Sequence, residues 1–187
     1  IMNKSPLVSI IACCYNHERF LVETLDSIRV QTYQNIELII IDDFSTDNSV
    51  KKINTWIKKN KYGCLFIQNK ENLGVVKTLN KALKRVSGKY LNFIACDDIY
   101  LTNKVENQVE IFEQLNQDYG AIYSDAYIID NYGKYNYGTQ ISIKQINKPP
   151  TGNIFEQLIT KDNFIPALSV LYKFSVIEEL SFFDENL

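Results

Sequence analysis

The sequence predicts an α/β fold in which a mostly parallel sheet is flanked by helices. Over the first two-thirds of the chain, continuous apolar runs alternate with segments whose apolar residues recur at helical spacing. Such runs are typical of parallel strands buried on both faces, and repeated strand–helix units form this kind of sheet through right-handed crossovers. After Tyr119 shorter runs and turn residues replace the pattern. We therefore expect a small antiparallel excursion in the C-terminal third.

The first two strand–helix units follow each other directly. Residues 7–14 are a continuous apolar run and are expected to form the first strand, and residues 18–31 have the spacing of an amphipathic helix. Residues 36–41 form the second predicted strand. The polar cluster at residues 45–47 is suited to an N-cap, so a second helix should follow it, with a buried face at Val50, Ile53 and Ile57.

Two further units are predicted in the same way. Residues 64–67 form a short third strand, and the loop at residues 69–74 precedes a helix whose apolar stripe is Val75, Val76, Leu79, Leu83 and Val86. Ser87-Gly88 ends this helix before a strand at residues 90–95. Thr102 is expected to cap a fourth helix that extends to Leu115.

The C-terminal third has weaker patterns. Residues 121–124 and 127–129 are predicted as strands, and the turn residues at 131–134 are consistent with an antiparallel arrangement. A loop at residues 148–152 is followed by a short predicted helix at 153–160. Residues 166–172 are expected to return to the sheet as a strand.

Composition excludes several classes of protein. The formal net charge is −2, and the Lys and Arg residues are scattered, which argues against a nucleic-acid partner. No apolar run approaches the roughly 20 residues that cross a bilayer, so we expect no transmembrane segment. The four cysteines fit no common zinc spacing and are expected to be reduced, buried thiols. We expect a cytoplasmic location, free or at the inner face of the membrane, and leave homo-oligomerisation open.

Pairs of aspartates follow two of the predicted strands. Asp97-Asp98 follow the strand at 90–95, and Asp42-Asp43 follow the apolar residues 38–41. Ligands of open α/β sheets bind at the carboxyl ends of the strands. Adjacent carboxylates repel each other there unless a cation or hydrogen-bond donors offset the charge. Since hard oxygen ligands suit Mg²⁺ or Mn²⁺, which often bind substrate phosphates as well, the pattern predicts a phosphate-bearing substrate held through a divalent metal.

The loop after the first strand limits how phosphates can be bound. Residues 14–18, Cys-Tyr-Asn-His-Glu, contain no glycine. A dinucleotide-binding fold of the dehydrogenase type and a P-loop both require a glycine-rich turn at this point. Neither is present, which favours a metal at Asp97 and Asp98 as the phosphate-binding element.

Four segments in order resemble the motifs of family 2 of the inverting glycosyltransferases. Residues 8–16 are similar to the opening strand of that family, and residues 31–47 are very close to its next motif. Asn72-Leu73-Gly74, with Asn80 further on, resembles the third element, and residues 95–98 resemble the metal-binding DXD motif. The resemblance extends from about Leu7 to the end of the chain.

The resemblance implies a GT-A fold and a role for several residues. Tyr15 would stack on the nucleobase, and Asp43 would accept a hydrogen bond from the imide N–H of uracil, whereas Asp42 has the same chemistry but is equally suited to capping its loop. Asp97 and Asp98 would divide the ribose and metal contacts, with the order left open. The nucleotide-binding set implied in this way is Ala12, Tyr15, Asp43, Asn72, Lys77 and Asp97. For Lys77 a solvated role is an equal alternative, and for His17 a capping or surface role is favoured.

The family also implies an activity, which is metal-dependent transfer of a sugar from a nucleotide-sugar donor, UDP-linked by preference, with inversion. The acceptor would be a glycan, lipid-linked or protein hydroxyl, in glycan, polysaccharide or glycoprotein synthesis. We expect one domain, residues 1–187, with a nucleotide-sugar-binding half at 7–118 and a partial acceptor-side half at 119–187.

The chain differs from the family pattern in two ways. Ala95 stands where the family often has an aspartate. Residues 182–187 resemble the segment just before the catalytic base, but the motif with the base itself does not follow. We therefore expect the general base after Leu187 and expect this chain to bind donor without efficient transfer. One alternative is a non-catalytic binding or assembly module of the same fold. A second is a sugar-nucleotide pyrophosphorylase, but that class of enzyme needs a glycine-rich first loop, and residues 12–18 contain no glycine.

Overall fold

The expected alternation of strands and helices is present in the computed structural model, which describes residues 5–160 and 163–186. Its main sheet has six strands in the order β3-β2-β1-β4-β8-β5. Their bounds are β1 Val8–Cys14, β2 Ile36–Asp42, β3 Leu65–Gln68, β4 Tyr90–Ala95, β5 Ala121–Ile122 and β8 Leu171–Lys173. Strands β3, β2, β1 and β4 are parallel, whereas β8 is antiparallel to both β4 and β5. The prediction of a mostly parallel sheet is confirmed.

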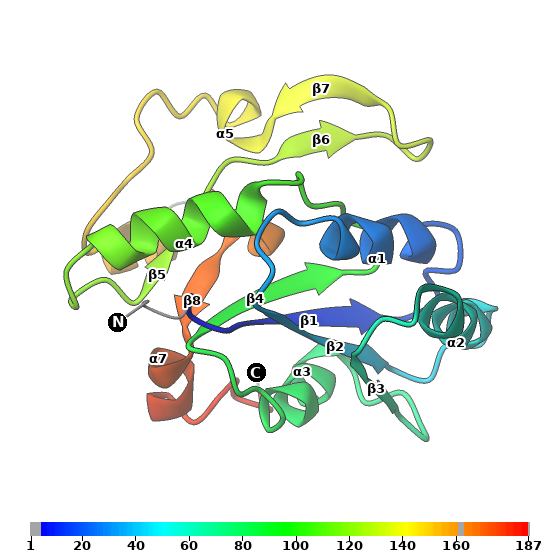
Figure 1. The fold of residues 1–187 in the computed structure, drawn as a ribbon. Helices are drawn as coiled ribbons and strands as arrows, with labels where there is room; N and C mark the ends of the chain where they lie inside the picture. The colour runs from blue at the N-terminus through cyan, green and yellow to red at the C-terminus, as the bar shows by residue number, and fades with distance from the viewer. Residues whose placement is uncertain (1–4, 161–162, 187) are drawn as a thin grey trace.

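Helices cover both faces of this sheet (Figure 1). One face packs against α1 Leu21–Arg29, α2 Ser49–Asn60 and α4 Lys104–Gln114, and the other against α3 Val75–Leu83 and α7 Phe174–Glu179. Along β1, Ile10 and Ala12 belong to the first core and Ile11 to the second. Because successive side chains of a strand point to opposite faces, a continuous apolar run fills both cores.

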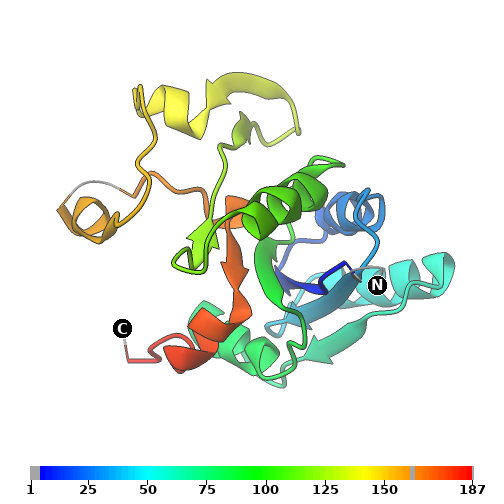
Figure 2. The same ribbon diagram turned by 60° about the vertical axis from the view of Figure 1, so that its left-hand side comes forward.

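The C-terminal third adds a second, two-stranded antiparallel sheet made of β6 Tyr127–Ile129 and β7 Tyr135–Thr139. The predicted turn joins these strands, with the amide of Gly133 donating to the carbonyl of Asp130. Helices α5 Gln140–Ile143 and α6 Phe155–Thr160 and a 3₁₀ turn, Ala167–Ser169, lead back to β8. In Figure 2 the hairpin and α6 stand clear of the main sheet and its helices. The expected antiparallel excursion is therefore present.

Several predicted boundaries were wrong. The first helix begins at Leu21 rather than near residue 18, because the carbonyl of His17 accepts the amides of Phe20 and Leu21 in a turn. Thr102 does not cap α4, which begins at Lys104 without a side-chain cap. Residues 167–169, predicted as strand, form the 3₁₀ turn, so only the end of that segment pairs with the sheet. Within the described ranges no helix is both long and apolar enough to cross a membrane.

Candidate functional site

The residues after β1, β2 and β4 are held side by side by the sheet. Cys14, the last residue of β1, is in register with Asp42, the last residue of β2. Backbone hydrogen bonds continue past the strands: the amide of Asp43 donates to the carbonyl of Cys14 at 2.9 Å, and that of Cys96 donates to Cys13 at 3.0 Å. The aspartate pairs that follow β2 and β4 therefore flank the end of β1.

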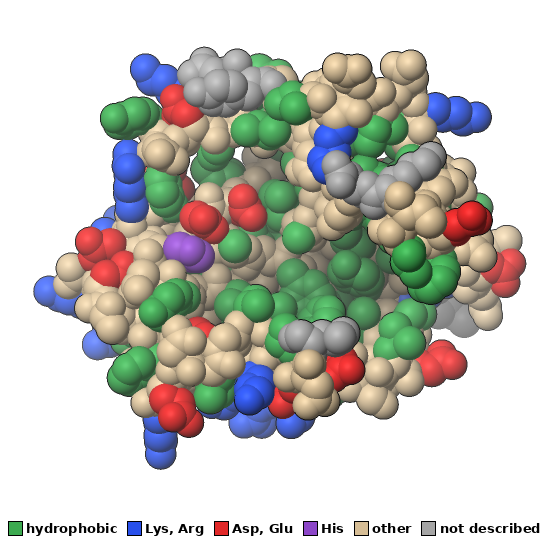
Figure 3. Space-filling view, turned by 180° about the vertical axis from the view of Figure 1, so that it is seen from behind, with side chains coloured by type: hydrophobic (Ala, Val, Ile, Leu, Met, Phe, Trp, Pro, Cys, Tyr) green, Lys and Arg blue, Asp and Glu red, His purple; other side chains and the backbone are tan. Residues whose placement is uncertain are grey.

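Asp97 and Asp98 lie at this edge beside the only histidine of the chain. Figure 3 shows the histidine next to acidic side chains, at the margin of a hollow in which hydrophobic side chains are prominent. Asp97 is exposed and Asp98 is partly buried. Burial, followed by repulsion from Asp97, raises the pKa of Asp98 to about 6, although His17 acts in the opposite direction. Positive charge at this point would relieve the repulsion between the two carboxylates.

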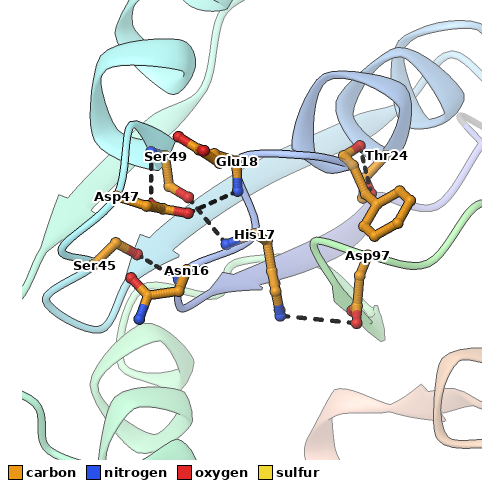
Figure 4. Close-up of polar contacts among 9 residues, drawn as sticks. Asn16, His17, Glu18, Thr24, Ser45, Asp47, Ser49 and Asp97 are labelled. Atoms are coloured by element: carbon orange, nitrogen blue, oxygen red, sulfur yellow. Dashed lines mark hydrogen bonds and ion pairs between the residues drawn. The ribbon is translucent and has the colours of Figure 1, made fainter. Parts of the chain in front are cut away.

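The structure places His17 in the site, which sequence reasoning did not predict. Its Nε2 lies 3.8 Å from Oδ2 of Asp97 (Figure 4). Its Nδ1 is buried and has no hydrogen-bond partner within the described ranges. The backbone amide of His17 donates to Oγ of Ser49 at 3.0 Å. The interpretation of His17 as a capping or surface residue therefore omitted its position beside a predicted ligand-binding carboxylate.

The loop that carries His17 is fixed to the loop between β2 and α2 (Figure 4). The amide of Asn16 donates to Oγ of Ser45 at 2.9 Å, and that of Glu18 donates to Oδ2 of Asp47 at 3.0 Å. The cluster at 45–47 was predicted to cap α2, and in part it does: the amide of Ser49, the first residue of α2, donates to Oδ1 of Asp47 at 2.9 Å, although the N-cap residue itself makes no side-chain cap bond. Ser45 and Asp47 also accept amides of the neighbouring loop, which gives the end of β1 a fixed conformation.

Asp43 is buried, with 4% of its surface exposed, and organises the loop before α3. Its Oδ1 accepts from Asn69 Nδ2 and from the amide of Leu73, each at 2.8 Å, and its Oδ2 accepts from the amide of Gly74 at 2.9 Å. Burial alone would raise the pKa of Asp43, but these bonds, together with Thr78, offset that effect and lower the pKa. A carboxylate has about four acceptor positions, and the four groups named here account for all of them, so a ligand would have to share or replace one of these bonds. The contact with uracil stays a prediction.

Asp42 is fully buried and accepts both the amide of Ser45, at 3.0 Å, and its hydroxyl, at 2.5 Å. Of the two roles that the sequence left open for Asp42, the capping of its own loop is therefore the one that the structure supports. The paired aspartates after β2 thus hold the loop at 43–45 and the loop at 69–74, respectively.

The other implied residues lie around the same edge. Tyr15 directly follows β1 and is 45% exposed, so its ring is accessible to a ligand. Asn72 is exposed, and its Oδ1 accepts the amide of Gly74 at 3.1 Å. Lys77 is exposed on α3, whereas Ala12 is fully buried in the core beneath the site. Nucleotide binding by these four residues stays a prediction.

Asn80, part of the third motif, has a structural role at the C-terminal segment. Its Nδ2 donates to the carbonyl of Phe183 and to Oε1 of Glu185, each at 2.9 Å, and its Oδ1 accepts the amide of Phe183 at 3.0 Å. These three bonds fix residues 183–185 to α3. Leu187, after which we expect the general base, lies outside the described residues.

The donor set fits a divalent cation that is shared with a ligand. Among the residues described, no group of three or more His, Cys, Asp or Glu could hold a metal ion by itself. Mg²⁺ typically binds through one or two carboxylates together with substrate phosphates. Asp97 and Asp98 supply those carboxylates, adjacent in the chain, and a cation between them would offset their mutual repulsion.

Comparison with known proteins identifies the family. The model of "Glycosyl transferase family 2" matches residues 9–181. The chain belongs to glycosyltransferase family 2. It is 33% identical over 183 residues to an uncharacterized glycosyltransferase of Rickettsia bellii, covering 97% of this chain and 26% of that protein. It is 31% identical over 183 residues to another from Rickettsia prowazekii, covering 98% and 55%. The chain thus spans between about a quarter and just over half of these relatives.

Solved structures share the fold of this family 2 chain. S. aureus TarS 1–349 aligns with a TM-score of 0.72 and 19% identity, covering 97% of this chain and 51% of that one. TarS 1–349 has also been crystallised with UDP and with UDP-GlcNAc. The mannosyltransferase PcManGT from Pyrobaculum calidifontis, in complex with GDP-Man and Mn²⁺, aligns with a TM-score of 0.71 and 17% identity, covering 99% and 49%. The predicted GT-A fold is confirmed.

Proposed function

We propose that this chain binds a nucleoside-diphosphate sugar, UDP-linked by preference, and serves as the donor-binding part of an inverting glycosyltransferase. The observation that carries the proposal is the arrangement at one sheet edge of Tyr15, Asp43, Asp97 and Asp98 in a chain of family 2. These residues offer an exposed aromatic ring, a buried acceptor and a pair of carboxylates. The base can use the ring and the buried acceptor, and the ribose and a metal-bound diphosphate can use the two carboxylates.

Tyr15 and Asp43 would both act on the base of the donor. The ring of Tyr15 would stack on the base, and the Asp43 carboxylate, by exchanging one of its present bonds, would accept from a base with an N–H group and so select it. Asp97 would bind the ribose, and Asp98, with Asp97, would hold Mg²⁺ or Mn²⁺. When bound, such a cation offsets charge on the departing diphosphate. The oxygen of an acceptor hydroxyl, losing its proton to a general base, would attack the anomeric carbon from the side opposite the diphosphate. The bond from that carbon to the diphosphate would break as the new one forms, so the configuration of the carbon would invert.

Thermal unfolding in the presence of a panel of nucleotide sugars tests this proposal. A ligand at one hundred times its Kd stabilises the folded state by about 2.7 kcal/mol, which raises Tm by roughly 5–10 °C in a domain of this size. We expect this shift with UDP-linked sugars in Mn²⁺ and a much smaller one after chelation with EDTA. The absence of any shift with UDP-, GDP- and CDP-linked sugars would contradict the proposal.

A further inference from the structure

His17 and Asp97 face each other as hydrogen-bond donor and acceptor without forming a direct hydrogen bond. The distance of 3.8 Å between Nε2 and Oδ2 is too long for a direct hydrogen bond, but one oxygen atom placed between them could bond to both. Both side chains reach solvent, with 26% of His17 and 47% of Asp97 exposed. A ligand that enters the site can therefore reach this gap.

The surroundings of the ring determine which nitrogen carries the proton. A neutral imidazole has one N–H and one acceptor nitrogen. Nδ1 is buried without a partner in the described part of the chain, and a buried N–H without an acceptor is rarer and costlier than an unused lone pair. The proton of the neutral ring therefore belongs on Nε2, which faces Asp97. The pair presents an N–H donor and a carboxylate acceptor toward the same point.

The two groups are also held in place before a ligand binds. Three consecutive amides, those of residues 16–18, donate to Ser45 and Asp47 of the β2–α2 loop and to Ser49, the first residue of α2 (Figure 4). On the other side, the amide of Cys96 donates to Cys13 at the end of β1, one residue before Asp97. Binding at this pair would therefore need little ordering of the backbone.

A hydroxyl group fits such a pair, because it donates one hydrogen bond and accepts another. A phosphate oxygen would be repelled by Asp97. His17 is two residues after Tyr15, and Asp97 directly precedes Asp98. In the proposed donor, the base would contact Tyr15 and the metal-bound diphosphate would lie at Asp98, and the ribose is the part that joins them. We infer that His17 is a specificity-determining residue, whose Nε2–H binds, together with the Asp97 carboxylate, one ribose hydroxyl of the donor. This inference rests on the proposed function.

Calorimetric titration in Mn²⁺ with UDP, 2′-deoxy-UDP and 3′-deoxy-UDP tests the inference on the wild type and on three variants. His17→Ala should weaken UDP binding about 3- to 10-fold, the usual worth of one hydrogen bond. One of the deoxy analogues should bind less tightly than UDP to the wild type, and that difference should largely disappear in His17→Ala. His17→Gln should restore it, because a glutamine amide nitrogen reaches the position of Nε2, whereas His17→Asn, which reaches only the position of Nδ1, should behave like His17→Ala.

The outcomes separate the inference about His17 from the proposed function on which it rests. If the wild type binds UDP in Mn²⁺ but each deoxy analogue loses the same affinity in the wild type and in all three variants, His17 does not contact a hydroxyl and the inference is wrong. If the wild type binds none of UDP, GDP and CDP, the proposed function is overturned, and the inference with it; if it binds GDP or CDP instead of UDP, the deoxy forms of that nucleotide replace the UDP analogues in the same comparison. Should His17→Ala fail to fold, the contrast between His17→Gln and His17→Asn decides the question, since both keep a polar side chain of similar size.

Discussion

Lys104 provides a quantitative test of how the segment between Asp98 and α4 is packed. Its Nζ lies 4.2 Å from the centroid of the Tyr100 ring and donates to Oε1 of Gln108 at 2.7 Å. Burial of the amine lowers the pKa of Lys104 from 10.5 to about 7. Since one pKa unit corresponds to about 1.4 kcal/mol, the protonated form is disfavoured in the folded protein by at most about 5 kcal/mol.

The sign of the pH dependence follows from this lowered pKa. Between pH 7 and 10.5 the side chain of Lys104 is protonated in the unfolded chain and largely neutral in the folded protein. The unfolded state then binds more protons, so the contribution of Lys104 to stability rises with pH through this window. Below pH 7 both states are protonated, and the full cost of burying the ammonium group is present.

Replacement by methionine removes the ionisable group and keeps an unbranched side chain against Tyr100. The hydrogen bond to Gln108 is lost, which costs about 1 kcal/mol. Replacing a buried ion pair by apolar side chains of similar volume stabilises by about 1–4 kcal/mol in favourable cases, and we take the same range for the single amine of Lys104. We therefore expect Lys104→Met to raise the free energy of unfolding by an amount in this range at pH 6, and the gain to shrink steadily up to pH 10.

Urea unfolding followed by the fluorescence of Trp56, the only tryptophan, measures this difference at several pH values between 6 and 10. All other groups titrate in both proteins, so the difference between the two curves isolates Lys104. Lys51→Met is the matched control, because Lys51 is exposed on α2, and its difference curve should be flat. A gain that does not change with pH, or a loss of stability at every pH, would refute the burial of this amine.

Three further predictions concern the site and its support. Asp98→Ala should abolish Mn²⁺-dependent binding of UDP while leaving the circular dichroism spectrum unchanged; retained affinity in calorimetry would contradict the metal assignment. Asp43→Ala should weaken UDP binding and reduce the preference over CDP and GDP. It should also lower Tm, because the amide of Leu73 loses its acceptor and that of Gly74 keeps only Asn72. Equal affinities of the wild type for all three nucleotides would contradict base selection by Asp43. Gly88→Ala should destabilise the protein by roughly 1–3 kcal/mol, since its Cβ would lie 2.7 Å from the backbone nitrogen of Ser9; an unchanged urea midpoint would show that β1 can move to accommodate it.

The strands of the main sheet could be predicted from sequence because burial on both faces leaves a strong pattern. Tyr90–Ala95 was predicted with its observed bounds, and the predicted first strand differs from β1 by one residue. The C-terminal third was harder, since its strands are short and its pairing is decided by contacts with distant residues. Val75 shows the limit of periodicity, because it lies in the predicted apolar stripe of α3 but is 60% exposed.

The candidate site was predicted in part for a similar reason. Aspartates after apolar runs indicate strand ends directly, and parallel topology then brings Asp43 near Asp97. The position of His17 depends on side chains about 30 residues away, such as Ser49, that accept amides of its loop. No local pattern in residues 14–18 encodes that arrangement. The hydrogen bonds by which Asp43 holds the loop at 69–74 also could not be predicted, because that loop is about 30 residues away in sequence and comes close to Asp43 only in the folded protein.

Titration of UDP into the protein by calorimetry, in Mn²⁺ and again in EDTA, tests the central claim most directly. The proposed arrangement of Tyr15, Asp43, Asp97 and Asp98 predicts saturable binding at one site per chain in Mn²⁺. It also predicts a loss of most of that affinity when the metal is chelated. Equal affinity in both buffers would contradict the role of the two carboxylates, and no binding in either buffer, by UDP or by GDP and CDP in its place, would contradict the nucleotide-sugar site itself.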